Sequence, residues 1–240
     1  MIELRPTDIA HGGEAVARVD GKAHFVAGAM PGELVTGEIV RDKKRWARVE
    51  LAAVVEPSPD RVEPPCPYFG ECGGCQWQYA AYPAQLDWKQ RIVAGQLRHL
   101  GGVADPPVRE TAATGDPYGY RNRMDFAVGF GTVGLRRRKS RDLAAIDRCL
   151  LMHPTIAEVY ERVDGLDDAR GLTLRAGIAT GETLAVVKGE VPDGIGAWGC
   201  SVSQRTDDGL QPIIGDGFVH EEVGGVTFRV TGDAFFQNNT

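Results

Sequence analysis

The chain has 240 residues with an ordinary hydrophobic content of 42%, which is enough for one large domain or two smaller ones. It contains no apolar run long enough to span a bilayer and no apolar stretch near its start that would direct export, so membrane and secreted classes are not expected. We therefore expect a cytoplasmic monomer whose cysteines do not form a disulfide framework.

The charge of the chain is unevenly distributed. The formal net charge is −6, which argues against a general nucleic-acid binder. Residues 86–141, however, hold 11 Lys and Arg against 5 Asp and Glu, a net +6, while residues 142–240 hold 7 against 16, a net −9. A basic middle segment can attract phosphates locally, and the alternative is a solvated basic face.

Residues 1–56 have the pattern of a small β-barrel. Ala15 to Val19 runs into Asp20-Gly21, a strong hairpin signal, and residues 34–40 and 46–55 read as later strands. A five-stranded barrel of the OB type fits this size. The turn between the later strands carries charge beside an aromatic side chain, which suits single-stranded RNA, although a solvated turn with the aromatic ring capping the core is the alternative. These residues are Lys43, Lys44, Arg45 and Trp46.

Residues 57–83 form a proline-rich linker followed by three cysteines in the spacing C-x5-C-x2-C, namely Cys66, Cys72 and Cys75. Thiolates gathered in this way bind zinc or an iron–sulfur cluster, and a fourth ligand must come from Cys149 or Cys200. Zinc sites usually have two short cysteine pairs, whereas three close cysteines and a distant one favour a [4Fe–4S] cluster. Zinc and plain buried thiols remain the alternatives.

Residues 84–115 predict a helix and a loop. Pro83 suits the start of a helix, and Gly101-Gly102 suits its end. One face is apolar at helical spacing, so we expect this helix to dock on another domain; the residues on this face are Leu86, Val93, Leu97 and Leu100.

Residues 116–230 predict an antiparallel sheet with one or two helices, which makes the whole chain α+β and mostly β. Strands are expected from Tyr120 to Val128 and near 172–178, 183–191 and 218–231, with a helix over 154–163. The first strand alternates and places its arginines on one face, and a basic run follows it, so a phosphate-binding surface is predicted, with solvated charge as the alternative. Its candidate residues are Tyr120, Arg121, Arg123, Arg136, Arg137 and Arg138.

Other polar residues are expected to have no functional role. Arg162 and Arg170 lie in the acidic C-terminal part of the chain and are not expected to contribute to RNA binding. The five histidines show no ligand spacing and are interpreted as structural or surface residues. Cys200 has no apparent base or cation beside it and is interpreted as a structural thiol.

Several stretches together resemble the TRAM-domain family of SAM-dependent RNA (uracil-5-)-methyltransferases, which act on ribosomal or transfer RNA. The resemblance covers the whole chain in order. It is carried by Gly13–Gly21 with Phe25-Val26 and Pro31-Gly32-Glu33, by Pro57–Arg61 with Cys66, Cys72-Gly73-Gly74-Cys75 and Gln78, by Tyr82, Gln85, Leu86 and Lys89, by Tyr120-Arg121-Asn122, by Cys149, and by Phe235-Phe236-Gln237-Asn238-Asn239. Tyr79 departs from the pattern, because many family members have His there.

The resemblance implies a TRAM barrel over 1–56, a linker and cysteine loop over 57–83, a helix over 84–115 that docks on the catalytic domain, a central domain over 116–230, and the start of a methyltransferase domain over 231–240. It implies that Cys149 is the fourth ligand of a [4Fe–4S] cluster and that Gln237 contacts SAM. It further implies a monomeric RNA-binding protein that methylates uridine C5 in rRNA or tRNA.

The family's mechanism needs a SAM-binding Rossmann-like domain, a cysteine that adds to C6 of uracil, and a carboxylate base. We expect these to be largely absent from this chain, which would then be inactive alone, with no catalytic residue. Two phenylalanines just before the last residues also predict that more chain follows. A stand-alone iron–sulfur RNA-binding module without catalysis is the alternative, and a zinc-stapled RNA-binding protein is a third reading.

Overall fold

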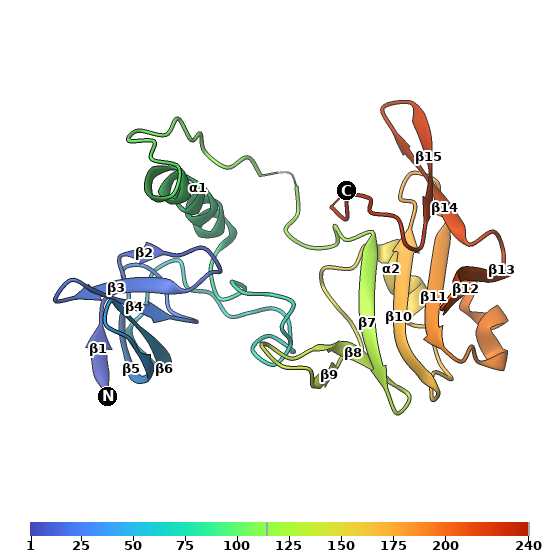
Figure 1. Ribbon diagram of the computed structural model, residues 1–240, viewed down its shortest axis with the longest axis horizontal. Helices are drawn as coiled ribbons and strands as arrows, with labels where there is room; N and C mark the ends of the chain where they lie inside the picture. The colour runs from blue at the N-terminus through green and yellow to red at the C-terminus, as the bar shows by residue number, and fades with distance from the viewer. Residues whose placement is uncertain (114, 240) are drawn as a thin grey trace. The chain divides into compact units, whose positions relative to one another are not determined.

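The computed structural model describes residues 1–113 and 115–239, which divide into two compact units. The N-terminal unit comprises residues 1–67 and 75–115, and the C-terminal unit comprises residues 68–74 and those from Asp116 onward. A seven-residue segment of the cysteine loop therefore belongs to a different unit from the residues on either side of it. Each unit is described by itself below (Figure 1).

The N-terminal unit is built on a six-stranded sheet in the order β1-β5-β6-β4-β3-β2. Its pairs are antiparallel except β4 with β6, which run parallel. Five strands were expected; β1 and β2 are only three and two residues long, too short to show alternation. The strands are β1 (Ile2–Leu4), β2 (Asp8–Ile9), β3 (Ala15–Val19), β4 (Lys22–Val26), β5 (Leu34–Asp42) and β6 (Trp46–Glu56).

The Asp20-Gly21 hairpin is confirmed. Both residues have positive φ, 48° and 76°, and they join β3 to β4 with Val19 opposite Lys22. Two central residues with positive φ are the requirement of the type I′ turn, whose twist matches that of antiparallel strands. Inward-facing side chains of these strands, such as Ala15 and Val26, are fully buried.

The expected helix is α1 (Tyr82–His99), with Pro83 in its first turn. Its buried residue is Trp88, whose ring meets that of Trp77 edge-on, with centroids 5.4 Å apart. The apolar face anticipated from the sequence is largely uncovered in this chain, since Val93 and Leu97 are exposed.

The C-terminal unit contains a seven-stranded sheet in the order β13-β12-β11-β10-β7-β8-β9. Every neighbouring pair is antiparallel except β11 with β12. The expectation of a mostly β, α+β fold is therefore confirmed. The strands are β7 (Arg123–Gly129), β8 (Thr132–Arg136), β9 (Leu143–Ala145), β10 (Ala169–Ala176), β11 (Thr183–Gly189), β12 (Ser201–Thr206) and β13 (Gly209–Ile214).

One face of this sheet packs on the helix α2 (Pro154–Tyr160) and the 3-10 helix η1 (Asp193–Trp198). α2 is shorter than expected and ends at Tyr160, whose ring stacks on Phe126 at 4.7 Å between centroids. Trp198 is fully buried in the same core. No strand was predicted from the sequence at the positions of β12 and β13.

The stretch 218–231, expected as one strand, is a hairpin of β14 (Phe218–Val223) and β15 (Val226–Thr231). Gly224 and Gly225 both have positive φ and form its turn. A second apolar cluster, distinct from the α2 core, joins this hairpin to the sheet through Leu184, Val186, Val219 and Val230. None of the helices in the described part of the chain is apolar and long enough to cross a bilayer.

Candidate functional site

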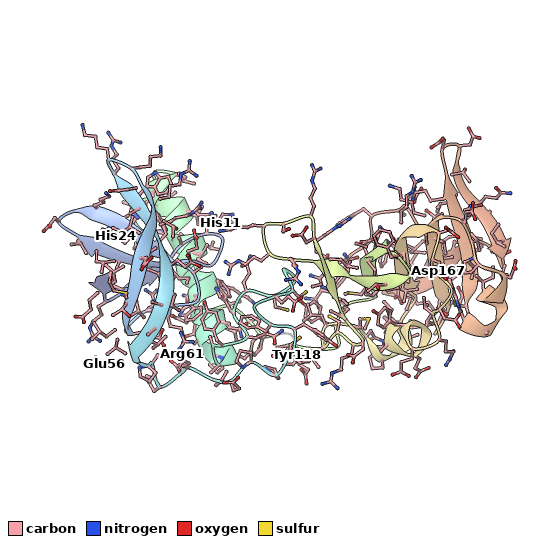
Figure 2. All side chains as sticks on the ribbon, turned by 90° about the horizontal axis from the view of Figure 1, so that it is seen from below. His11, His24, Glu56, Arg61, Tyr118 and Asp167 are labelled. Carbon is pink, nitrogen blue, oxygen red and sulfur yellow. The ribbon has the colours of Figure 1, made fainter. Side chains whose placement is uncertain are left out.

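Two sequence motifs in the N-terminal unit are joined by an ion pair. Glu33 is fully buried and receives a bidentate bond from Arg61, with Nε at 2.6 Å and Nη2 at 2.7 Å from its two carboxylate oxygens. The amide nitrogens of Met30 and Ser58 donate to the same carboxylate, at 2.8 and 3.1 Å. Arg61 also donates to the Gly28 carbonyl oxygen at 2.8 Å. Arg61, which Figure 2 labels, thereby fixes the linker to the loop around Glu33 just before the cysteine loop.

Burial raises the pKa of the Glu33 carboxyl, but the hydrogen bonds from Arg61 and from the two backbone amides lower it more, so the net pKa lies below its ordinary value. Glu33 is therefore ionised at neutral pH. The partners that keep it ionised all lie outside the strands of the sheet, so a single carboxylate holds these loops together.

Residues after the cysteine loop hold its first part. The Gln78 side chain, which is buried, accepts a hydrogen bond from the Cys66 amide at 3.2 Å. Trp77 donates from its indole to the Gly13 carbonyl oxygen at 3.1 Å. Motifs that the sequence singled out separately are thus in contact within this unit.

The segment from Tyr68 to Gly74 is held within the C-terminal unit. The Tyr68 hydroxyl donates to Asp147 Oδ1 at 2.5 Å, and the Gly73 amide donates to the Arg136 carbonyl oxygen at 2.9 Å. Glu71 forms an ion pair with Arg137 at 2.7 Å. Arg137 is therefore already engaged in fixing the cysteine loop.

The cysteines are half-buried, and none of the five is in a disulfide. Cys66 and Cys75 belong to the N-terminal unit, and Cys72 and Cys149 belong to the C-terminal unit. Within residues 1–113 and 115–239, no group of three or more His, Cys, Asp or Glu is placed to hold a metal ion. The cluster remains a prediction.

Cys200 agrees with its interpretation as a structural thiol. It packs against the α2 core, and burial raises its pKa to about 11. The thiol therefore stays protonated at neutral pH. Histidines also have structural contacts: the His153 side chain caps α2 by accepting from the Thr155 amide at 3.3 Å.

The candidate RNA-binding turn of the N-terminal unit is exposed at Lys43, Lys44 and Arg45. Trp46 is half-buried, with the guanidinium groups of Arg41 and Arg48 over its ring at 5.3 and 5.7 Å. The ring is thus flanked by cations. Both the RNA-binding and the core-capping interpretations of Trp46 fit these contacts.

The start of β7 binds the C-terminal segment of the chain. Asn122 is buried, and its side chain donates to the Gln237 carbonyl oxygen at 2.9 Å while its amide donates to the Asn238 carbonyl oxygen at 3.1 Å. The backbone of Arg121 forms an isolated antiparallel β-bridge with Asn239. The Gln237 side chain itself is exposed. Asn122, a polar residue on the apolar face of the strand, thus positions the backbone of Gln237 and Asn238. It was part of the family resemblance, but no role was predicted for it.

Arg123 is paired rather than available. Its Nη2 lies 2.9 Å from Asp125 Oδ1, on the face of the sheet opposite α2, and Asp125 also accepts from Thr173. Arg175, which the sequence did not single out, is buried and donates to the Ala234 carbonyl oxygen at 2.7 Å. Burial and then the neighbouring Arg123 lower the Arg175 pKa to about 10, so it remains charged at neutral pH.

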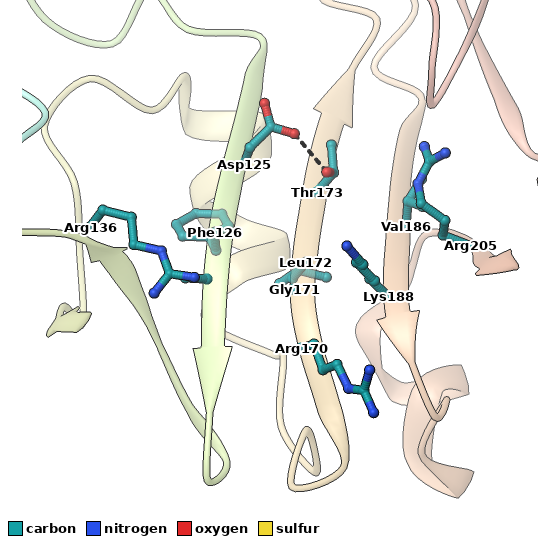
Figure 3. A pocket seen from close by; sticks show the side chains of 11 residues that line it. Asp125, Phe126, Arg136, Arg170, Gly171, Leu172, Thr173, Val186, Lys188 and Arg205 are labelled. Carbon is teal, nitrogen blue, oxygen red and sulfur yellow. Dashed lines mark hydrogen bonds between the residues drawn. The ribbon is translucent and has the colours of Figure 1, made fainter. Parts of the chain in front are cut away.

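A basic hollow lies next to these residues on the same face of the sheet, with a volume of about 330 Å³ (Figure 3). Arg136 from the predicted basic run lines it, and Arg138 is exposed nearby in the same run. The other cations lining the hollow were not predicted. They are Arg170, Lys188 and Arg205.

Comparisons with known proteins agree on one family. No family model matches the chain. An uncharacterized RNA methyltransferase of Gloeobacter violaceus is 33% identical over an alignment that covers 96% of this chain and 60% of that protein. A 23S rRNA (uracil(1939)-C(5))-methyltransferase of Alkalilimnicola ehrlichii is 37% identical over 65% of this chain and 36% of that protein. Along nearly its whole length the chain is therefore similar to RNA methyltransferases.

The fold agrees with this assignment. A solved tRNA (uracil-54, C5)-methyltransferase of Pyrococcus abyssi, in complex with S-adenosyl-L-homocysteine, matches 99% of this chain with a TM-score of 0.72 at 24% identity. The match covers 61% of that enzyme. The chain thus spans about 60% of the length of the first relatives that it matches.

Proposed function

We propose that the protein carrying this chain is a SAM-dependent RNA (uracil-5-)-methyltransferase that modifies rRNA or tRNA, and that this chain is its RNA-binding and iron–sulfur part. The observation that carries the proposal is the 37% identity to a 23S rRNA uracil-C5 methyltransferase. The match to the Pyrococcus enzyme's fold supports it. The N-terminal sheet would be the TRAM domain of this enzyme.

The proposal is tested on RNA from cells that lack the gene. We expect m5U to disappear from one site in rRNA or tRNA when digested nucleosides are measured by mass spectrometry, and to return when the intact gene is restored. Unchanged m5U at every rRNA and tRNA site would contradict the proposed activity.

We further propose that SAM, which supplies the methyl group, is bound mainly by residues outside this chain. In the described residues the parallel pairs β4–β6 and β11–β12 are not connected by an α-helix, unlike the strand–turn–helix units that bind such cofactors. Gln237 would be one contact to SAM, held in place through its backbone by Asn122. The uncovered apolar face of α1 would pack against the domain that completes the SAM site.

The isolated 240-residue chain is expected to bind SAM weakly or not at all and to transfer no methyl group, because one contact does not make a pocket. Isothermal calorimetry measures the binding, and tritium transfer from labelled SAM to RNA measures the activity. Micromolar binding, or any turnover by the chain alone, would show that the cofactor site lies within it.

We propose that Cys66, Cys72, Cys75 and Cys149 bind a [4Fe–4S] cluster. The support is the C-x5-C-x2-C spacing with a distant fourth cysteine. The remaining cysteine, Cys200, packs on the α2 core, and burial raises the pKa of its thiol to about 11. A stand-alone iron–sulfur RNA-binding module remains the alternative function, and the m5U measurement separates it from the enzyme.

RNA would be bound by the turn Lys43, Lys44, Arg45 and Trp46 and by the basic strand region Tyr120, Arg121, Arg123, Arg136, Arg137 and Arg138. The structure supports these candidates unequally. Arg136 and Arg138 are exposed, whereas Arg123 and Arg137 are in ion pairs with Asp125 and Glu71. Arg136 and Arg138 are therefore the stronger candidates for contacts with phosphate.

A further inference from the structure

We infer that the basic hollow on the seven-stranded sheet, lined by Arg136, Arg170, Lys188 and Arg205, is a binding site for the RNA phosphodiester backbone. This inference rests on the proposed function for the choice of ligand. It adds three cations from the acidic C-terminal half of the chain, among them Arg170, which the sequence had placed outside the RNA-binding surface.

The strand register explains the hollow. Ala127 on β7 lies opposite Gly171 on β10, Gly171 lies opposite Lys188 on β11, and Lys188 lies opposite Arg205 on β12. Paired residues share a face of the sheet, so this row has a small residue on two strands followed by a cation on each of the next two. The missing side-chain volume at Ala127 and Gly171 makes the floor, and the long basic side chains make the wall (Figure 3).

A β-bulge adds Arg170 to the same face. Leu172 and Ala169 both pack in the α2 core, so strict alternation from Leu172 would turn Arg170 into that core. The register instead shifts between Ala169 and Gly171, and Arg170 lines the hollow beside Gly171. Bulges re-aim side chains in this way and are frequent next to functional sites.

The charge of the hollow is not balanced by its own carboxylates. Asp125 is held by Arg123, and Arg205 forms an ion pair with Asp233. Among the ion pairs described in residues 1–113 and 115–239, none involves Arg136, Arg170 or Lys188. Three exposed cations around a shallow floor therefore create a local positive potential, to which the buried Arg175 on the same face adds.

The shape of the site favours a phosphate backbone over an apolar partner. The cations come from four different strands, and they outnumber the carboxylate of Asp125 in a lining that also includes Phe126, Ala127, Leu172 and Val186. Arginine and lysine at the edge of an open, shallow surface contact phosphate oxygens without reading the base, so the site would position RNA. A protein segment as the occupant is the competing outcome of the test.

The test measures the binding of a fluorescent oligouridylate of about 20 nucleotides to the 240-residue chain across a salt series. The variant carries Arg170→Gln and Lys188→Gln. Its matched control carries Arg162→Gln and Arg229→Gln, which removes two charges from the same unit; Arg162 lies just beyond α2, and Arg229 lies over the Phe218 ring on the β14–β15 hairpin.

We expect the Arg170/Lys188 variant to bind about tenfold more weakly, with a log–log salt dependence flatter by about 1.4, because each phosphate contact on a single strand contributes about 0.7. The control is expected to match the unmodified chain. In addition, RNA should protect Lys188 from an amine acylating reagent, measured by peptide mass spectrometry. All four substitutions are at exposed positions, so folding, checked by circular dichroism, should not change.

Equal losses in the variant and the control would overturn the inference, because they would mean that only net charge matters. A Lys188 that RNA does not protect from acylation would also overturn it, because the hollow would then not contact the RNA backbone and a protein segment would be left as its occupant. Either result with m5U still dependent on the gene leaves the proposed function standing. If RNA protects Lys188 but m5U does not change in the deletion strain, the inference about the hollow holds and the proposed enzymatic activity is wrong.

Discussion

Replacing Glu33 by alanine is expected to destabilise the N-terminal unit by about 3–5 kcal/mol, the cost of breaking a buried ion pair from one side. The substitution removes the acceptor of four hydrogen bonds, two from Arg61 and two from backbone amides. The Arg61 guanidinium would then be left without its carboxylate partner. Urea unfolding followed by tryptophan fluorescence measures the change, because Trp77 and Trp88 lie in this unit.

The matched control is Glu56→Ala. Glu56 also pairs with an arginine, Arg5, at 2.5 Å, but the two side chains of this pair are 59% and 50% exposed. Exposed pairs contribute about 0–1 kcal/mol, so this variant should unfold almost like the unmodified chain. If the two variants lost equal stability, the Glu33–Arg61 pair would not have the special role assigned to it.

The pH dependence of this effect has a definite sign. The folded pKa of Glu33 lies below its ordinary value of 4.5, so its contribution to stability is fully present above that value and is lost as the pH falls through the folded pKa. The stability difference between the unmodified chain and Glu33→Gln should therefore be largest near neutrality and shrink on acidification. A difference that grows towards acid pH would contradict the ionised assignment.

Replacing any one of Cys66, Cys72, Cys75 or Cys149 by serine is expected to remove the iron from the protein. Anaerobically purified unmodified protein should be brown, with broad visible absorption and about four irons per chain, and each variant should be colourless. The Cys66→Ser variant should in addition unfold or aggregate, because part of the free energy of metal binding is free energy of folding.

Cys200→Ser is the control for these four variants. Cys200 packs on the α2 core and is not among the proposed ligands, so its variant should keep its colour and iron content. Stoichiometric zinc in place of iron would reject the cluster. Iron lost from Cys200→Ser but kept in Cys149→Ser would show that the distant ligand had been assigned to the wrong cysteine.

Local signals in the sequence were enough for many elements. The positive-φ pair Asp20-Gly21 and the helix start at Pro83 were found because each depends on a few adjacent residues. Strict alternation likewise identified β7 and the side on which Arg123 and Asp125 lie. The family resemblance rested on motifs of the same local kind.

Features that depend on pairing between distant strands were missed. The bulge that turns Arg170 outward follows from the register between β10 and β11, and no property of Arg170 itself reveals it. Lys188 and Arg205 are adjacent because the parallel strands β11 and β12 pair with each other. The chain between these two strands passes through η1. Composition placed these three cations in an acidic segment, whereas the register gathers them on one face.

The assignment of Tyr68–Gly74 to the C-terminal unit has a consequence for the order of folding during synthesis. Tyr68 bonds to Asp147, a partner 79 residues later in the chain. At a translation rate of about 5–20 residues per second, that partner is made roughly 4–16 s after Tyr68. The backbone partners of Cys72 and Gly73, Arg137 and Arg136, are also made after residues 75–115, so this segment waits without its strand until the whole N-terminal unit has been synthesised.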